Sequence, residues 1–138
     1  MASNLPVVTF APLIPGATSI DQKTIGFWLQ MSVGAGVYAT GGIPAGLNTF
    51  VGTYTVDDTT FLWAEINSEL TVPLNGVFYT YKYIPSTDKL QIFQTPVTGG
   101  QQESASPGLV TSELSASAII PAGVLNDVII AHFIYNRL

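Results

Sequence analysis

The sequence predicts an all-β fold, a small antiparallel β-sandwich or barrel with an extended N-terminal arm. Short runs rich in β-branched and aromatic residues recur along the chain, and such residues favour strands. Segments rich in glycine and proline separate these runs, and both residues are typical of turns. One run, residues 77–84, alternates with the period of two that a strand requires. We therefore expect an arm over residues 1–20, followed by a single β domain over residues 21–138.

The arm is predicted from its proline content. Residues 1–20 contain three prolines and one glycine among several apolar residues, a composition that suits an extended segment better than a helix. Two interpretations stay open. In one, the segment packs on its own domain or is disordered. In the other, it docks on a neighbouring subunit, and the contacts are made by Leu5, Val7, Val8 and Phe10.

The first strand of the β domain is predicted over residues 24–33, where β-branched and aromatic side chains are frequent. Glycines between residues 34 and 42 mark bends in which a helix would be costly. The tetrapeptide IPAG at 43–46 predicts a turn, because proline suits the second turn position and glycine the fourth. A second strand is expected over residues 47–56.

Residues 61–66 admit two interpretations. Leu62, Ile66 and Leu70 have the spacing of a helix face, and they follow aspartates that could cap a helix. The run is short, however, and it alternates between two segments that both have strand character. We favour a strand that ends in a turn at 67–68 and is followed by another strand.

The clearest local signal is Asn75-Gly76, a dipeptide preferred in two-residue hairpin turns. Residues 77–84 follow as a strand, and residues 85–88 form a turn into a further strand over 89–93. One face of the strand over 77–84 carries Val77, Tyr79, Tyr81 and Tyr83. This part of the chain is therefore predicted to be a meander.

The last third of the chain begins with residues 95–112, which are rich in Gly, Ser, Gln and Pro and predict a mobile, exposed loop. The tetrapeptide IPAG recurs at 120–123, and we interpret the two copies as similar turns rather than as a duplicated half-domain. The closing run, residues 128–135, is apolar on both faces. Such a run is expected of a central strand or of a strand sealed by a partner.

Charged side chains are scarce. The chain has four Lys and Arg and nine Asp and Glu, which is 9% of its 138 residues, while 47% are apolar; a typical soluble domain carries about 25% charged residues. We therefore expect other subunits to cover part of its surface. The net charge of −5 and the scattered basic residues argue against binding to nucleic acid or to an anionic membrane. No apolar run approaches the length of about 20 residues that a membrane-spanning helix needs.

Few residues are available for catalysis. His132 is the single histidine and cysteine is absent, so we interpret His132 as a buried or interface imidazole rather than as part of a catalytic triad or a metal site. Asp57 with Asp58, or Glu65 with Glu69, could serve a small hydrolase, but their spacing indicates no shared cleft, and the two aspartates suit a turn. No enzyme activity, metal or cofactor is predicted.

Four features together resemble the small head decoration, or cement, proteins of tailed bacteriophages. They are the sequence YATGG at 38–42, the hairpin over 77–93, the residues ELS at 113–115 and the terminal apolar strand. The resemblance covers roughly residues 24–138. Neither the proline-rich arm nor the long loop over residues 95–112 matches a feature of that family. It implies a protein that binds the outside of an icosahedral shell, commonly as a trimer where several coat subunits meet, and that has no catalytic residues.

From this resemblance we expect a structural virion protein that is assembled in the host cytoplasm and placed on the outer surface of the capsid. Its partners would be the major capsid protein and further copies of itself, most simply as a homotrimer. The alternative is a carbohydrate- or receptor-binding β-domain of a phage fibre or another tail or head appendage. In that case Tyr79, Tyr81, Tyr83 and Trp63 would form a platform on which sugars stack.

Overall fold

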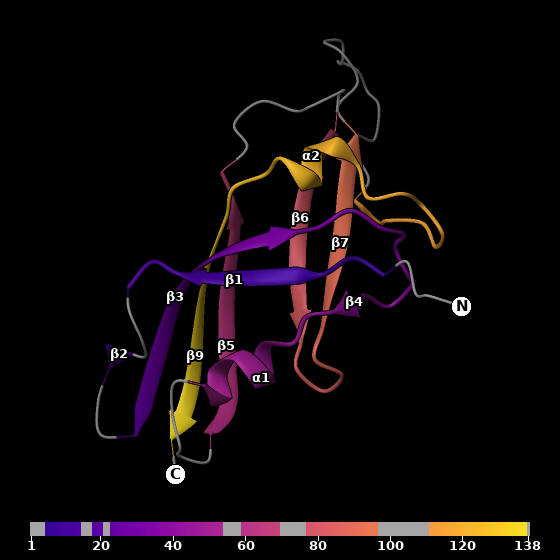
Figure 1. The fold of residues 1–138 in the computed structure, drawn as a ribbon. Coiled ribbons are helices and arrows are strands. Elements are labelled where there is room, and N and C mark those ends of the chain that lie inside the picture. The colour runs from indigo at the N-terminus through magenta and orange to yellow at the C-terminus, as the bar shows by residue number, and fades with distance from the viewer. Residues whose placement is uncertain are drawn as a thin grey trace.

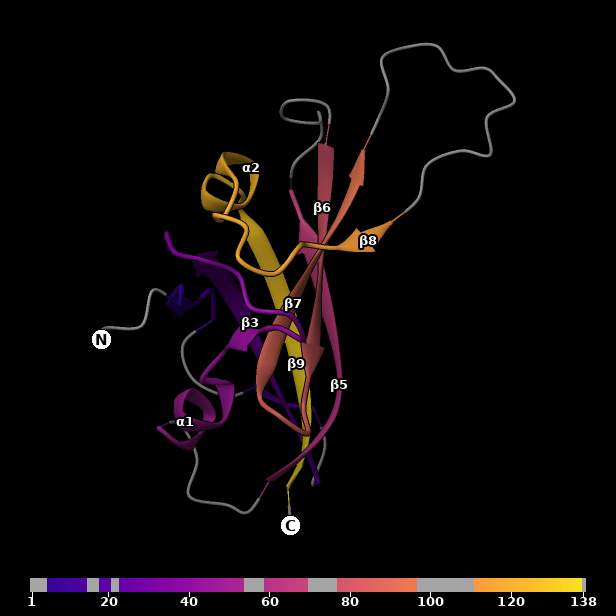
Figure 2. The ribbon, with the colours of Figure 1, turned by 90° about the vertical axis from the view of Figure 1, so that its right-hand side faces the viewer.

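Two antiparallel sheets make up the fold, and the prediction of an all-β sandwich is confirmed (Figure 1). The computed structural model describes residues 5–14, 18–20, 23–53, 59–69, 77–96 and 111–137. The five-stranded sheet contains β1 (Val8–Pro12), β2 (Thr18–Ser19), β3 (Thr24–Val33), β5 (Thr59–Ser68) and β9 (Ile129–Arg137). The four-stranded sheet contains β4 (Ile43–Pro44), β6 (Val77–Ile84), β7 (Lys89–Pro96) and β8 (Ser112–Glu113). Two short helices, α1 (Leu47–Gly52) and α2 (Ala122–Leu125), lie toward opposite ends of the sandwich (Figure 2).

The closing strand β9 lies in the middle of the five-stranded sheet, whose order is β1-β3-β9-β5, with β2 also paired to β3. It runs antiparallel to β3 on one side and to β5 on the other. Ala131 and Phe133 are buried on the face toward the second sheet, and Ile134 is buried on the opposite face. The predicted central strand, apolar on both faces, is confirmed.

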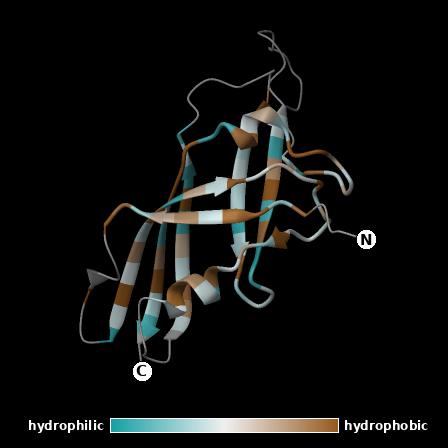
Figure 3. Ribbon diagram, in the orientation of Figure 1, coloured by the Kyte–Doolittle hydropathy of each residue, from teal (hydrophilic) through white to brown (hydrophobic). Residues whose placement is uncertain are grey.

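The hydrophobic core lies between the two sheets. Alternate residues of β3 and β9 are buried there, and β6 contributes Tyr79, Tyr81 and Tyr83 from the other sheet. Figure 3 shows the apolar bands that recur along β3. The strands predicted over 24–33, 61–66, 77–84 and 89–93 are all present. The strand interpretation of residues 61–66 is thus correct, and the helix interpretation is wrong. The turn predicted at 67–68 is also wrong, because Asn67 and Ser68 continue β5 and pair with Ile130 and Ile129 of β9.

The strand predicted over residues 47–56 is wrong in its described part, because residues 47–52 form α1. Gly46 has a φ of 71°, a left-handed conformation that reverses the chain just before the helix. Leu47 and Val51 are one helical turn apart and are both buried. The N–H of Leu47 donates a hydrogen bond to Oδ1 of Asp88 at 3.1 Å, which satisfies one of the free N–H groups at the helix start.

The two copies of IPAG differ in backbone conformation. In the first copy, Ile43 and Pro44 pair with β7 as β4, and Gly46 turns the chain. In the second copy, Pro121 is extended and precedes α2, so that Gly123 lies inside a helix. The interpretation of the copies as two similar turns is therefore wrong, because only the first copy turns the chain at its glycine, whereas the second runs into a helix.

The described part of the predicted arm belongs to its own domain. Residues 8–12 form β1, which pairs with β3 from Val8 opposite Val33 to Pro12 opposite Leu29. The segment is extended, as expected, and it packs on the domain that follows it.

Several predictions fall outside the described residues. They include the hairpin turn at Asn75-Gly76, the aspartates at 57 and 58, and residues 97–110 of the predicted loop. The turn over residues 85–88 is described, and it joins Ile84 of β6 to Lys89 of β7.

Candidate functional site

Exposed apolar side chains gather on the outer face of the five-stranded sheet, the face turned away from the core. We call the exposed Ile20, Trp28 and Trp63, together with the partly exposed His132 and the buried Ile134 that lie among them, the aromatic face. The exposed fraction is 36% for Trp28 and 48% for Trp63. Both tryptophans of the chain lie on this face, Trp28 on β3 and Trp63 on β5. Strand β9, which carries His132, lies between them (Figure 1).

Strand alternation and one bulge place the two tryptophans on the outside. In β3, Phe27 is buried in the core, so its neighbour Trp28 points to the opposite face. In β5 the register shifts between Phe61 and Trp63, which is the signature of a β-bulge at Leu62. Phe61 consequently packs on the core, while Leu62 and Trp63 are both exposed.

His132 lies at the centre of the aromatic face. Its imidazole is stacked on Trp28, with ring centroids 3.8 Å apart and planes 10° from parallel, and the ring of Trp63 meets it edge-on at 5.9 Å and 78°. Gly26 makes room for this arrangement. A Cβ atom at residue 26 would lie 2.9 Å from Nε2 of His132 and 3.2 Å from Cδ1 of Ile134, so any larger residue would displace the imidazole.

The charge of this region comes from a carboxylate. Glu65 is exposed and lies directly across the strand pair from His132. Desolvation lowers the pKa of His132 below its usual 6.5, and the charge of Glu65 opposes this shift only in part. His132 is therefore mainly neutral at pH 7, because its pKa lies below 6.5, and Glu65 supplies the carboxylate beside the aromatic rings.

The predicted sugar platform does not form. Tyr79, Tyr81 and Tyr83 are buried between the sheets, whereas Trp63 is exposed on the outer face of the other sheet. Tyr81 donates a hydrogen bond to Oδ2 of Asp127 at 2.7 Å. Tyr83 donates one to Oδ1 of Asp88 at 2.6 Å. These rings hold the core together and cannot stack on a ligand.

Buried phenols predict a steep loss of stability at alkaline pH. Desolvation raises the pKa above the usual 10.0 for Tyr38, Tyr79, Tyr81, Tyr83 and Tyr135. Above pH 10 the unfolded chain therefore releases these protons before the folded chain does, so stability that is full below pH 10 is lost as the pH rises further. We expect the absorbance of tyrosinate at 295 nm to appear together with the loss of circular dichroism. Gradual ionisation near pH 10 in a folded protein would contradict this.

The structure divides the four predicted arm contacts into two pairs. Leu5 and Val7 are exposed, and Val7 is 68% exposed. Val8 is only 9% exposed and belongs to the core. Phe10 is partly buried and packs against the rings of Phe50 and Phe133. Val8 and Phe10 therefore stabilise their own domain, and the exposed pair is accessible to a partner.

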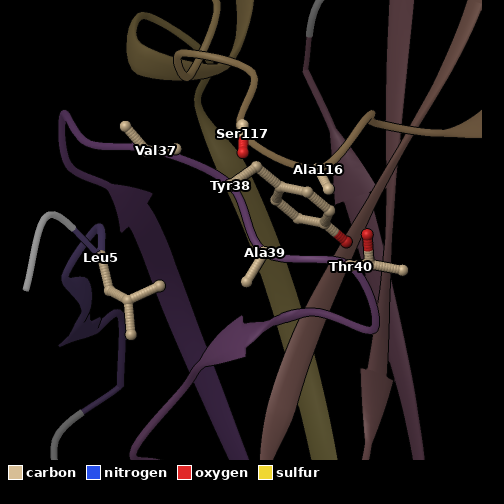
Figure 4. A pocket seen from close by; sticks show the side chains of 7 residues that line it. All are labelled: Leu5, Val37, Tyr38, Ala39, Thr40, Ala116 and Ser117. Atoms are coloured by element: carbon tan, nitrogen blue, oxygen red, sulfur yellow. The ribbon is translucent and has the colours of Figure 1, made fainter.

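A pocket of about 460 Å³ opens beside Tyr38 (Figure 4). Its lining residues are Leu5, Val37, Tyr38, Ala39, Thr40, Ala116 and Ser117. The hydroxyl of Tyr38 donates to Oε2 of Glu113 at 2.5 Å and accepts from the N–H of Ile92 at 3.3 Å. Because this hydroxyl is engaged, the pocket presents mainly apolar groups, and it suits an apolar side chain better than a reacting substrate.

The other candidate acids do not form a reaction centre in the part of the chain that is described. Glu65 and Glu69 are both exposed, and Glu65 lies beside aromatic rings rather than beside a second carboxylate. Within the described ranges no group of three or more His, Cys, Asp or Glu could hold a metal ion. Over the same ranges neither helix has the length and apolar character to cross a membrane.

Comparison of the chain with protein-family models, with curated proteins and with solved structures gives no match.

Proposed function

We propose that this protein is a structural virion protein that binds the outer surface of an icosahedral capsid and stabilises the shell by bridging coat subunits. The observation that carries the proposal is the aromatic face. Two tryptophans are exposed together on the outer side of a sheet, and buried tryptophans are frequent hot spots of protein interfaces. An exposed apolar patch of this kind marks an interaction surface.

A protein that bridges two subunits needs two separate contact surfaces. The aromatic face offers one, on the outer side of β3, β9 and β5. The second lies at the N-terminal end of β1, where Leu5 and Val7 are exposed and Leu5 borders the pocket beside Tyr38. Two such surfaces on one chain suit a protein that acts through several contacts at once.

In this proposal the protein acts as a homo-oligomer, a trimer in the simplest case, on the outside of the virion, and its partner is the major capsid protein. Linking several copies turns the later contacts into intramolecular ones, so the avidity exceeds the affinity of a single copy by about 100-fold or more. The scarcity of charge, 9% of residues, also supports a surface that other subunits cover.

The proposal is tested by cosedimentation of the purified protein with capsid shells assembled without it. We expect the wild-type protein to bind, and the double variant Trp28→Ala/Trp63→Ala to bind about 100-fold more weakly, because two interface anchors are removed. The matched control is Ile119→Ala, since Ile119 is exposed but lies outside the aromatic face.

Circular dichroism and thermal melting of each variant establish that it is folded before binding is compared. Failure of the wild-type protein to bind shells would refute the proposed function. Equal binding of the double variant and the Ile119→Ala control would refute the role of the aromatic face.

A further inference from the structure

The described charged side chain on the outer face of β3, β9 and β5 is acidic. The described side chains that alternate onto the outer face of β3, β9 and β5 include the carboxylate of Glu65 and no Lys or Arg, and Glu69 follows directly after β5. Trp63 and Glu65 are two residues apart on the same face of β5, so their side chains are neighbours. The region thus combines aromatic rings with the carboxylate of Glu65, and Lys82 of β6 lines a pocket together with Trp63 at the neighbouring sheet edge.

Most other described carboxylates are engaged inside the fold. Glu113, Asp88 and Asp127 accept hydrogen bonds from the phenols of three tyrosines, at 2.5, 2.6 and 2.7 Å. Each of them also accepts a second hydrogen bond, from Gly41 N–H, Leu47 N–H and Ser68 Oγ respectively. Glu65 differs from them because it is exposed beside the aromatic face.

We propose that the aromatic face binds an arginine side chain of the protein partner, with the guanidinium stacked on Trp63 and paired with the carboxylate of Glu65. A guanidinium is planar and weakly hydrated, and it both stacks on indole rings and forms hydrogen bonds to carboxylates. Displacing water from this face strengthens the attraction between the two charges. The neutral state of His132 at pH 7 leaves the negative charge of Glu65 uncompensated by the imidazole.

Charge complementarity selects a basic partner over a second copy of this chain. In a two-fold symmetric contact through this face, each Glu65 would approach the acidic face of the other copy. Contact between copies through this face is therefore disfavoured, whereas an arginine-bearing segment is attracted to it; the homo-oligomer of the proposed function would form through other surfaces. The inference deepens the proposed function, because it states the chemistry by which the coat protein would be recognised.

The test uses the two tryptophans as separate reporters. A chain with two tryptophans gives two indole N–H signals in a ¹H–¹⁵N correlation spectrum, and both residues belong to the aromatic face. The full-length protein is titrated with a tetra-arginine peptide and, in parallel, with a tetra-citrulline peptide, whose side chains have a similar shape without the charge. We expect the arginine peptide to shift the indole signal of Trp63 most and the citrulline peptide to shift neither signal.

Two variants, each of which removes one negative charge, distinguish a specific arginine site from general electrostatic attraction between the peptide and the acidic protein. Glu65→Gln should weaken the binding of the arginine peptide about tenfold, because it removes the charged partner of the guanidinium. Glu69→Gln should change it less than twofold, because Glu69 is exposed and lies beyond the end of β5, away from the aromatic rings. Both variants are checked by circular dichroism.

Three outcomes would overturn the inference: no indole shift with tetra-arginine, equal shifts with both peptides, or equal weakening by the two glutamine variants. These results are independent of the shell assay. An arginine site in a protein that does not bind shells would refute only the proposed function. Shell binding without an arginine site would refute only this inference.

Discussion

Deletion of residues 1–12 should lower the free energy of unfolding by about 4 kcal/mol, a large part of the total for a domain of this size. The deletion removes β1 and its pairing with β3. It also removes Val8 from the core and the ring of Phe10 from its contacts with Phe50 and Phe133. Urea denaturation followed by circular dichroism measures the effect.

The matched control is Val7→Ser, which changes an exposed side chain next to β1 and should alter stability by less than about 0.5 kcal/mol. An unchanged denaturation midpoint for the deletion would show that β1 is dispensable and would restore the interpretation of a free arm. The same comparison guides the shell assay. Loss of binding by the deletion is uninformative if the domain has unfolded, whereas loss of binding by Val7→Ser identifies a contact.

Strand positions could be predicted from the sequence because alternation is a local property. The run over residues 77–84 and the two-sided apolar run over 128–135 each indicate a strand without reference to the rest of the chain. Helix α1 could not be predicted in this way, since its sequence LNTFVG contains residues of poor helix propensity. Its support comes from burial of Leu47 and Val51 and from Asp88, which is 41 residues away.

The candidate site was harder to predict because it depends on register. Alternation places three tyrosines of β6 on one face, but it does not say whether that face meets a second sheet or solvent. The stacking of Trp28 on His132 requires that two distant strands pair in one register. One local signal was available: Trp28 alternates with Gln30, a residue type that is mostly exposed, whereas Phe27 alternates with the apolar Ile25 and Leu29.

The structure shows where several of the few carboxylates lie and which groups they bind. Asp88, Glu113 and Asp127 accept hydrogen bonds from tyrosines inside or at the edge of the sandwich, and Asp127 is buried. The buried Asp127 contributes little charge to the surface, so the shortage of surface charge is slightly greater than the composition indicates. This strengthens the argument that part of the surface is an interface.

Replacement of Asp127 by alanine should lower the free energy of unfolding by about 3 kcal/mol. Asp127 is 8% exposed and accepts hydrogen bonds from Tyr81 at 2.7 Å and from Ser68 at 2.8 Å. It thereby links the segment before β9 to β6 and to the end of β5. The alanine variant leaves the buried phenol of Tyr81 without its acceptor. Chemical denaturation measures the loss, with Glu69→Ala as the control at an exposed acid.

A double-mutant cycle separates the hydrogen bond from the other effects of the substitution. Tyr81→Phe alone should cost about 1 kcal/mol, because it removes the donor and leaves Asp127 bound to Ser68. In the double variant Asp127→Ala/Tyr81→Phe no phenol is left unpaired, so its cost should fall short of the sum of the single costs by about 1 kcal/mol. Additive costs would contradict a direct bond. A cost of Asp127→Ala no larger than that of Glu69→Ala would mean that this carboxylate does not hold the two sheets together.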